Sequence, residues 1–240
     1  MIAAQDAVEP APLRIGFHAR FDPEWHFYWR SAGETGLPPR FDWSQSKNVA
    51  RVEILWPLPE RYNLGGFEAL GYSDEVVLPM TVVPRDSARA VEIRVNAIFA
   101  TCKDVCAIHD ETFVLNLPPG VGLRTPYAGL IDTYAARVPV HDAGGLTIEA
   151  LRLAGPAAAR VLEFHARSNS PWRNADAFVE GPEGFTFLRP AIAIGRAEYD
   201  ARFRIPVRGR AEWPRGAAVV ITLSNGSDAI ERRLIPSRTE

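Results

Sequence analysis

Short runs of β-branched and aromatic residues, broken by proline, glycine and aspartate, recur along this chain and restrict its possible folds. The 20 prolines and 18 glycines separate these runs at intervals typical of turns. In the first half the runs are LRIGFHARF, WHFYW, RVEILWPLP, EVVLPMTVV, AVEIRVNAIFA and ETFVLNLPP. This pattern predicts an antiparallel β-sandwich and does not suit alternating strands and helices.

One segment has a helical pattern, TPYAGLIDTYAARVP at residues 125–139. Thr125 is the expected N-cap, and Pro139 is expected to end the helix. After it, HDAGG reads as a linker. We therefore expect an all-β chain in three parts: a β-sandwich over residues 1–123, a helical linker over 124–143 and a second β-sandwich over 144–240.

The second half repeats the strand pattern without a clear chemical centre. Its runs are LTIEALRLA, ARVLEFHARS, DAFVEG, FTFLRP, YDARFRIPV, AAVVITLS and AIERRLIP. Asn225 and Gly226 between the last two form a strong hairpin signal. This half contains no cysteine, and its one histidine, His165, stands alone.

Composition excludes several classes of function. The formal net charge of −2 gives no general attraction to nucleic acid or to an anionic membrane. No run of about 18 apolar residues is present, so no membrane-spanning helix is predicted. The start, MIAAQDAVEPAP, lacks the basic and apolar regions of a secretory signal. We expect either a cytosolic protein or a mature form whose leader has been removed.

The only two cysteines, Cys102 and Cys106, lie in the segment ATCKDVCAIHD. On a helix, residues four apart have Cβ atoms about 5–6 Å apart, whereas a disulfide requires about 3.8 Å. If the flanking segments are instead two strands of a hairpin, the three residues between the cysteines form its loop. The two thiols then face each other across the first pair of the ladder. A bridge there can open and close with little backbone movement, which favours reversible redox chemistry.

Two other interpretations of the cysteines remain open at this point. A structural staple of so short a loop stabilises by only about 2 kcal/mol in the chain-entropy model. A Cu(I) site is the sharper rival, because Cys102, Cys106 and His109 supply two thiolates and an imidazole. Lys103 and His109 favour a thiolate, while the neighbouring carboxylates oppose it, so no strongly activated thiol is expected.

Several motifs of the first half occur together in one known family. They are WHFYWRSAGETGLPP at residues 25–39, FDW at 41–43, WPLPERY at 56–62, GYSDEVVLP at 71–79 and CKDVC at 102–106. In this order they resemble the N-terminal periplasmic domain of the DsbD/ScsB family of thiol:disulfide interchange proteins. The resemblance covers residues 13–119, and the second half resembles, more weakly, the additional β-sandwich of ScsB-type ectodomains.

The resemblance implies an immunoglobulin-like fold for the first domain and a periplasmic electron carrier that needs no cofactor. In the family, a thioredoxin-like domain coupled to a membrane reductase domain supplies the electrons. The acceptors are periplasmic disulfide isomerases, thioredoxin-like proteins or peroxiredoxin-like proteins. The family's roles imply that Cys106 forms the mixed disulfide and Cys102 resolves it. Relatives are also linked with copper tolerance.

Four further residues are candidates for the surroundings of the cysteines. Strand alternation sends His26 and Tyr28 to the face opposite the neighbouring tryptophans, so these two are expected to line the site. The family's disulfide is shielded by an aromatic residue of a cap loop, and Phe67 and Tyr72 are the candidates here. The GETGLPP loop is expected to rim the same surface.

Overall fold

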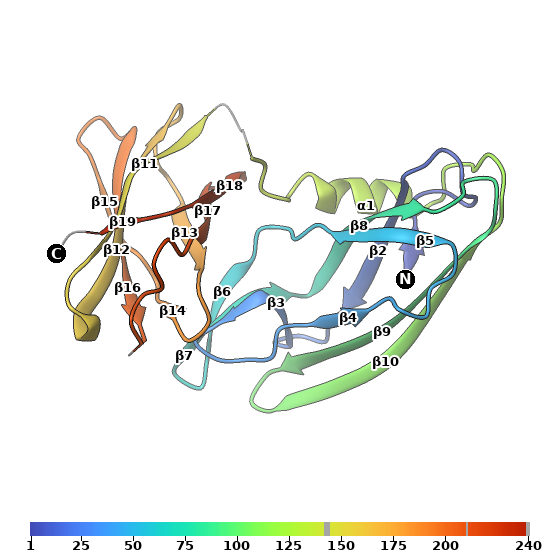
Figure 1. The fold of residues 1–240 in the computed structure, drawn as a ribbon, viewed down its shortest axis with the longest axis horizontal. Helices are drawn as coiled ribbons and strands as arrows, with labels where there is room; N and C mark the ends of the chain where they lie inside the picture. The colour runs from blue at the N-terminus through green and yellow to red at the C-terminus, as the bar shows by residue number, and fades with distance from the viewer. Residues whose placement is uncertain (142–144, 210, 239–240) are drawn as a thin grey trace. The chain divides into compact units, whose positions relative to one another are not determined.

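The structure is a computed structural model that describes residues 1–141, 145–209 and 211–238. Its regular elements are nearly all strands, with one short α-helix among the described residues, so the predicted all-β class is confirmed (Figure 1). The chain divides into two compact units, Met1–Val138 and Pro139–Glu240. The predicted HDAGG linker falls partly on residues 142–144, outside the described residues. No helix in the described ranges has the length and apolar character needed to cross a membrane.

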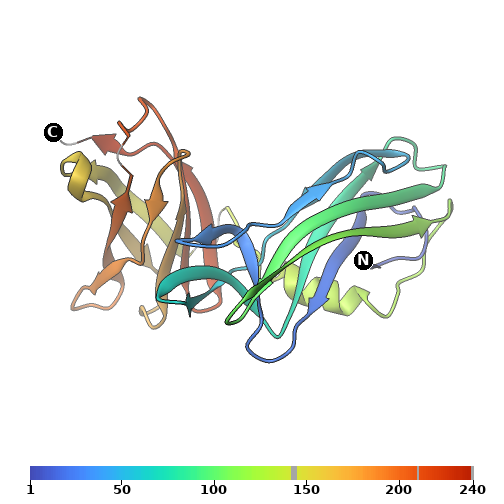
Figure 2. The same ribbon diagram turned by 90° about the horizontal axis from the view of Figure 1, so that it is seen from below.

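Two antiparallel sheets form the first unit. One sheet has the order β1-β2-β8-β5, with bounds Ile2–Ala3, Leu13–Arg20, Glu75–Pro84 and Val49–Ile54. The other has the order β10-β9-β3-β7-β6, with bounds Cys106–Leu117, Val91–Cys102, His26–Gly33, Phe67–Ser73 and Glu60–Leu64. A short strand, β4 (Arg40–Asp42), also pairs with β9. The β9–β10 hairpin is the long green ribbon in Figures 1 and 2.

Alternation along β9 explains how the sequence places the core of the first unit. Val91, Ile93 and Val95 are buried, whereas the polar residues between them are partly exposed. Phe17 of β2 then contacts Phe27 of β3 and Phe99 of β9 across the interior, with ring centroids 6.0 and 5.7 Å apart. Because successive strand residues face opposite sides, this buried aromatic set leaves the other face of β9 and β3 to form the site.

The helix, α1 (Ala128–Ala135), belongs to the first unit. It packs against β8 and β2, and the Tyr134 hydroxyl donates a hydrogen bond to the Glu75 carbonyl at 2.7 Å. The N-cap is Tyr127, not Thr125 as expected; the Thr125 hydroxyl instead accepts a hydrogen bond from the Tyr127 amide. The boundary between the two compact units lies after the helix, between Val138 and Pro139.

The second unit also has two sheets. The larger has the order β14-β16-β12-β11-β19, with bounds Thr186–Phe187, Asp200–Arg208, Arg160–Ser168, Leu146–Ala154 and Ser237–Arg238, and β15 (Ala191–Ile194) also pairs with β16. The smaller has the order β13-β17-β18, with bounds Ala175–Glu180, Val219–Asn225 and Asp228–Leu234. A single 3-10 turn, Ala157–Ala159, precedes β12. The predicted hairpin at Gly226 joins β17 to β18, and the core stacks Phe164 on Phe203 with ring centroids 4.7 Å apart.

Candidate functional site

The two cysteines lie at the turn of the β9–β10 hairpin, one on each side of the connecting loop. The ladder runs without a break from the Val91–Leu117 pair to the Cys102–Cys106 pair, and the cysteines form a disulfide with Cα atoms 4.1 Å apart. The loop between them has three residues, and the Lys103 amide donates to the Val105 carbonyl at 3.0 Å. This is the hairpin arrangement predicted from the spacing. The ladder fixes both Cα positions, so the bond can open without moving the strands.

The two sulfur-bearing residues differ sharply in exposure. Cys102 is 0% exposed, whereas Cys106 is exposed. Two apolar residues flank the exposed cysteine: Val105 is 70% exposed and Ile108 is 71% exposed. Ile108 lies two positions beyond Cys106 on the same face of β10. A thiol or disulfide of another protein can therefore reach Cys106 but not Cys102, and it meets an apolar surface there.

Tyr28 of β3 covers the buried side of the disulfide. Its hydroxyl donates a hydrogen bond to Cys102 Sγ at 3.1 Å and lies 3.9 Å from Cys106 Sγ. Burial raises the pKa of Tyr28, so the phenol stays protonated and remains a donor. A donor at this position stabilises negative charge on the Cys102 sulfur when the disulfide opens.

His26 of β3 lies on the same face of the sheet as Cys102. It is directly opposite Cys102 in the β3–β9 ladder, and cross-strand partners share a face of the sheet. His26 and Tyr28 therefore both line the cysteine face, in the positions expected from strand alternation. The pKa of His26 is lowered, chiefly by burial, against the opposing effect of nearby carboxylates.

The glycine-rich loop after β3 closes over Tyr28. Gly36 has φ +121°, and a Cβ on it would lie 2.3 Å from the Tyr28 ring. Leu37 packs against the small cluster that contains Tyr28 and Cys102. The loop is fastened to β7, because the Glu34 amide donates to the Glu68 carbonyl at 2.9 Å. The loop thus rims the site, as expected, and only a glycine at position 36 lets it approach the ring so closely.

The β6–β7 hairpin supplies a wall that the sequence interpretation missed. Tyr62 stacks on His26 with ring centroids 4.0 Å apart, and Leu64 packs against the cysteine cluster. The signal was present in the sequence: Gly65 and Gly66, both with positive φ, form a two-residue hairpin turn between alternating strands.

Of the two aromatic residues predicted to shield the disulfide, Tyr72 does not lie on the cysteine face. Its side chain is buried, stacks on Phe27 in the core and donates a hydrogen bond to the Pro57 carbonyl at 2.8 Å. Phe67 is paired with Leu64 at the tip of the β6–β7 hairpin and is 53% exposed. Since residues two apart on a strand share a face, Phe67 lies on the cysteine side of β7 and Tyr72 on the core side.

Lys103 does not act on the sulfurs through a free charge. Its ammonium group forms an ion pair with Glu24 at 2.6 Å. The hydrogen bond and charge of Lys103 lower the pKa of Glu24, and Glu24 raises the pKa of Lys103 in return. The pair ties the tip of the hairpin to the segment that precedes β3.

His109 lies on the face of β10 opposite to Cys106, because the two are three positions apart. Its ring stacks on Phe99 at 4.8 Å, and Nε2 is 2.9 Å from the Thr101 hydroxyl. It lines an aromatic groove of about 480 Å³ together with Phe17 and Trp25. The Cu(I) ligand set of Cys102, Cys106 and His109 is therefore not assembled, and the described residues contain no cluster of three metal-ligating side chains.

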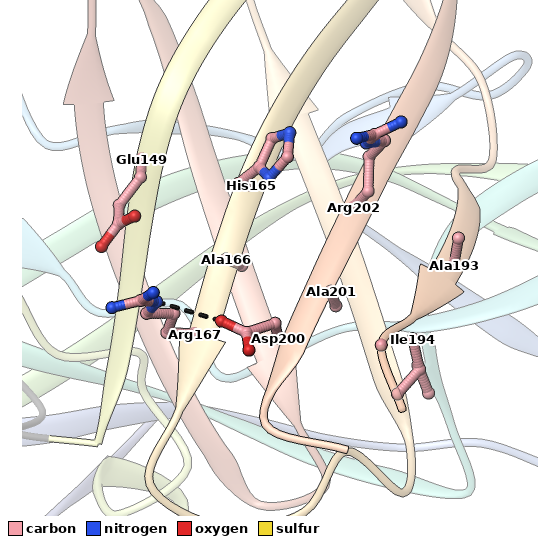
Figure 3. Close-up of a pocket in the computed structure, with 10 residues that line it drawn as sticks. Glu149, His165, Ala166, Arg167, Ala193, Ile194, Asp200, Ala201 and Arg202 are labelled. Carbon is pink, nitrogen blue, oxygen red and sulfur yellow. Dashed lines mark hydrogen bonds and ion pairs between the residues drawn. The ribbon is translucent and has the colours of Figure 1, made fainter. Parts of the chain in front are cut away.

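A shallow depression of about 330 Å³ lies on the exposed sheet face of the second unit (Figure 3). His165 of β12 stands there between Glu149 of β11 and Arg202 of β16. The neighbouring Arg167 and Asp200 form an ion pair at 3.0 Å. No cysteine lies in this unit, and the disulfide of the chain lies in the first unit.

Comparison with protein families places this site in a known context. Residues 1–118 match the sequence model of the N-terminal domain of the thiol:disulfide interchange protein DsbD. The first half of the chain belongs to the DsbD N-terminal domain family. Residues 137–239 match a domain family of unknown function. A comparison with curated proteins finds no match.

One solved structure has the fold of both units of this chain. The N-terminal periplasmic domain of ScsB from Proteus mirabilis superposes with a TM-score of 0.78 and 22% sequence identity. The match covers 99% of this chain and 92% of the ScsB chain. Both units are therefore present in that fold, and the disulfide at the end of the β9–β10 hairpin lies in the DsbD-like unit.

Proposed function

We propose that this protein is a periplasmic thiol–disulfide exchange protein that passes electrons through Cys102 and Cys106. The observation that carries the proposal is the unequal exposure of the two residues joined by one disulfide. An exposed sulfur can be attacked by another protein, and a buried sulfur beside it can complete the exchange without meeting solvent. Membership of the DsbD N-terminal domain family supports the same chemistry.

The exchange follows from this geometry in two steps. In the reduced protein, the Cys106 thiolate attacks a disulfide of the acceptor, forms a mixed disulfide and releases one acceptor thiolate, which takes up a proton. Cys102 then attacks Cys106 Sγ, re-forms the intramolecular disulfide and releases the second acceptor thiolate. The acceptor gains two electrons and two protons, and reduction of this protein by a thioredoxin-like domain runs the same steps in reverse.

The acceptors proposed from the family resemblance are disulfide isomerases, thioredoxin-like proteins and peroxiredoxin-like proteins of the periplasm. Val105 and Ile108 offer them a small apolar contact around the reactive sulfur. A brief exchange requires only a small interface, of less than about 1,200 Å² in total. The reductant proposed on the same grounds is a thioredoxin-like domain linked to a membrane reductase domain.

A redox titration of the full chain against glutathione tests the proposal. We expect a two-electron transition with a midpoint above about −300 mV, because structural disulfides of secreted proteins lie below that value. Alkylation of free thiols followed by mass measurement gives the reduced fraction at each ratio. A pair that stays oxidised throughout the titration is a structural staple, and the proposed function is then wrong.

Tyr28→Phe should make the cysteine pair more reducing. The change removes the hydroxyl that donates to Cys102 Sγ and keeps the buried ring. A hydrogen bond to a charged group contributes about 1.5–3 kcal/mol, and about 30 mV corresponds to 1.4 kcal/mol for two electrons. We therefore expect a midpoint about 30–65 mV more negative, measured in the same titration. Tyr134→Phe, which removes a hydroxyl bonded to the Glu75 carbonyl, is the control and should leave the midpoint unchanged.

A further inference from the structure

Two buried polar atoms beside the disulfide have no hydrogen-bond partner among the described residues. They are Nδ1 of His26 and the hydroxyl of Tyr62. An unpaired buried polar group costs about 1–3 kcal/mol, so such groups in a native site call for a physical reason. Both belong to side chains that stack on each other, with ring centroids 4.0 Å apart and planes 18° apart.

The local structure holds this pair of rings on the face of the sheet that carries Cys102. His26 is the direct cross-strand partner of Cys102, and the Cβ atoms of such partners lie about 4.5–5.5 Å apart. Position 71 opposite Tyr28 is a glycine, and a Cβ there would lie 2.8 Å from the Tyr62 hydroxyl. The Tyr28 ring, 6.5 Å from the Tyr62 ring, closes the other side.

The burial of Cys102 creates a requirement for a proton acceptor. Cys102 must lose its thiol proton to attack Cys106, because the thiolate is the nucleophile. Cys106 is exposed and can exchange its proton with water. Cys102 is 0% exposed and cannot do so directly. The proton must therefore pass to a group on the buried side of the disulfide.

We propose that His26 accepts the proton of Cys102 during the resolving step. This inference rests on the proposed function and identifies a further residue of that reaction. The S–H bond of Cys102 breaks, its proton moves to Nδ1 of the neutral imidazole, and the sulfur electron pair forms the bond to Cys106 Sγ. The acceptor's sulfur leaves as a thiolate with the electrons of the mixed disulfide. When the pair is reduced again, the imidazolium returns the proton to Cys102.

The surroundings keep His26 neutral before the step and favour its charged form after it. Burial lowers the pKa of His26, so the imidazole is unprotonated near neutral pH and can act as a base. The charged and titratable groups that face it from its own strand and from its neighbours are Glu24, Glu60, Asp74, Tyr62, Tyr28 and Cys102. The three carboxylates oppose the effect of burial and stabilise the imidazolium that forms. Lys103 is paired with Glu24.

Stopped-flow reaction of the reduced full chain with 5,5′-dithiobis(2-nitrobenzoate) separates the two steps. Attack by Cys106 releases one coloured thionitrobenzoate, and resolution by Cys102 releases a second. In His26→Phe, which keeps a stacking ring, we expect the second phase to slow at least about tenfold near pH 7, since general-base catalysis contributes about 10²–10⁴-fold. The first phase should change less than about twofold. The rate of the wild-type second phase should stop rising once the pH exceeds the pKa of His26, which lies below the usual value of about 6.5. In the variant, the rate of the second phase should keep rising with pH as the thiol ionises.

His109→Phe is the matched control, because His109 is also half-buried and stacked on an aromatic ring but lies on the opposite face. It should leave both phases unchanged. Tyr62→Phe keeps the ring that stacks on His26 and checks that the loss in His26→Phe is not caused by disturbed packing. If His26→Phe resolves at the wild-type rate with the wild-type pH profile, His26 is not the proton acceptor. If neither the wild type nor any variant releases a second thionitrobenzoate, the Cys102–Cys106 disulfide does not re-form and the proposed function itself is wrong.

Discussion

Replacing Cys102 with serine should trap the protein on its redox partners. In Cys102→Ser, the exposed Cys106 still attacks an acceptor disulfide, but no buried sulfur remains to release the product. A well-oriented intramolecular group acts at an effective concentration of about 10⁵ M or more, so its loss should lengthen the life of the mixed disulfide by about 10³-fold or more. Non-reducing gels of a periplasmic extract should show the adducts, and mass spectrometry should identify the acceptors.

The matched variant, Cys106→Ser, distinguishes the two cysteines. It leaves one thiol as well, but that thiol is fully buried beneath Tyr28. We therefore expect few or no adducts from Cys106→Ser under the same conditions. Adducts through Cys102 and none through Cys106 would reverse the assignment and contradict the argument from exposure.

Gly71→Ala should cause the largest loss of stability among small substitutions around the site. A Cβ at position 71 would lie 2.1 Å from the Phe27 carbonyl oxygen, inside the β3–β7 ladder, where the backbone cannot yield cheaply. It would also displace the Tyr62 hydroxyl, 2.8 Å away. Overpacking of this kind costs about 1–3 kcal/mol and sometimes more. Hydrogen exchange of β3 and β7 peptides should show faster exchange, corresponding to an opening free energy lower by about 3 kcal/mol.

Gly129→Ala is the control for that substitution. Gly129 is in the same unit, on α1, and a Cβ there meets no atom within 4 Å. Since glycine in a helix costs about 0.5–1 kcal/mol relative to alanine, this variant should be as stable as the wild type or slightly more stable. If the β3 and β7 peptides exchange hydrogen at the same rate in Gly71→Ala and Gly129→Ala, the close approach at position 71 does not hold the strands and Tyr62 in place.

The hairpin that carries the cysteines could be predicted because local rules determine it. Alternating apolar residues run up to Cys102, three residues follow, and strand residues resume at Cys106, so the register of the two strands leaves one pairing of the thiols. The same alternation correctly placed His26 and Tyr28 on the cysteine face. These predictions required only the two-residue period of a strand.

The surroundings of the disulfide depended on contacts between distant segments and were harder to predict. His109 is close to Cys106 in sequence, yet strand alternation turns it to the opposite face, so the structure does not bring the three candidate copper ligands together. Tyr72 is one of the two predicted shielding residues, but its position on β7 directs it to the core. The sequence analysis does not identify Tyr62, because its contact with His26 depends on β6 pairing with the far edge of β7, which in turn pairs with β3. Sequence alternation alone does not reveal this order of strands.

The most direct test of the account is the reduction of the native disulfide by a protein. The oxidised full chain is mixed with an equal amount of a reduced thioredoxin-fold protein, and free Cys102 and Cys106 are counted by alkylation while near-ultraviolet circular dichroism reports the fold. The account predicts that both thiols appear within minutes and that the dichroism stays that of the folded protein. A disulfide that yields only when the protein unfolds would contradict it.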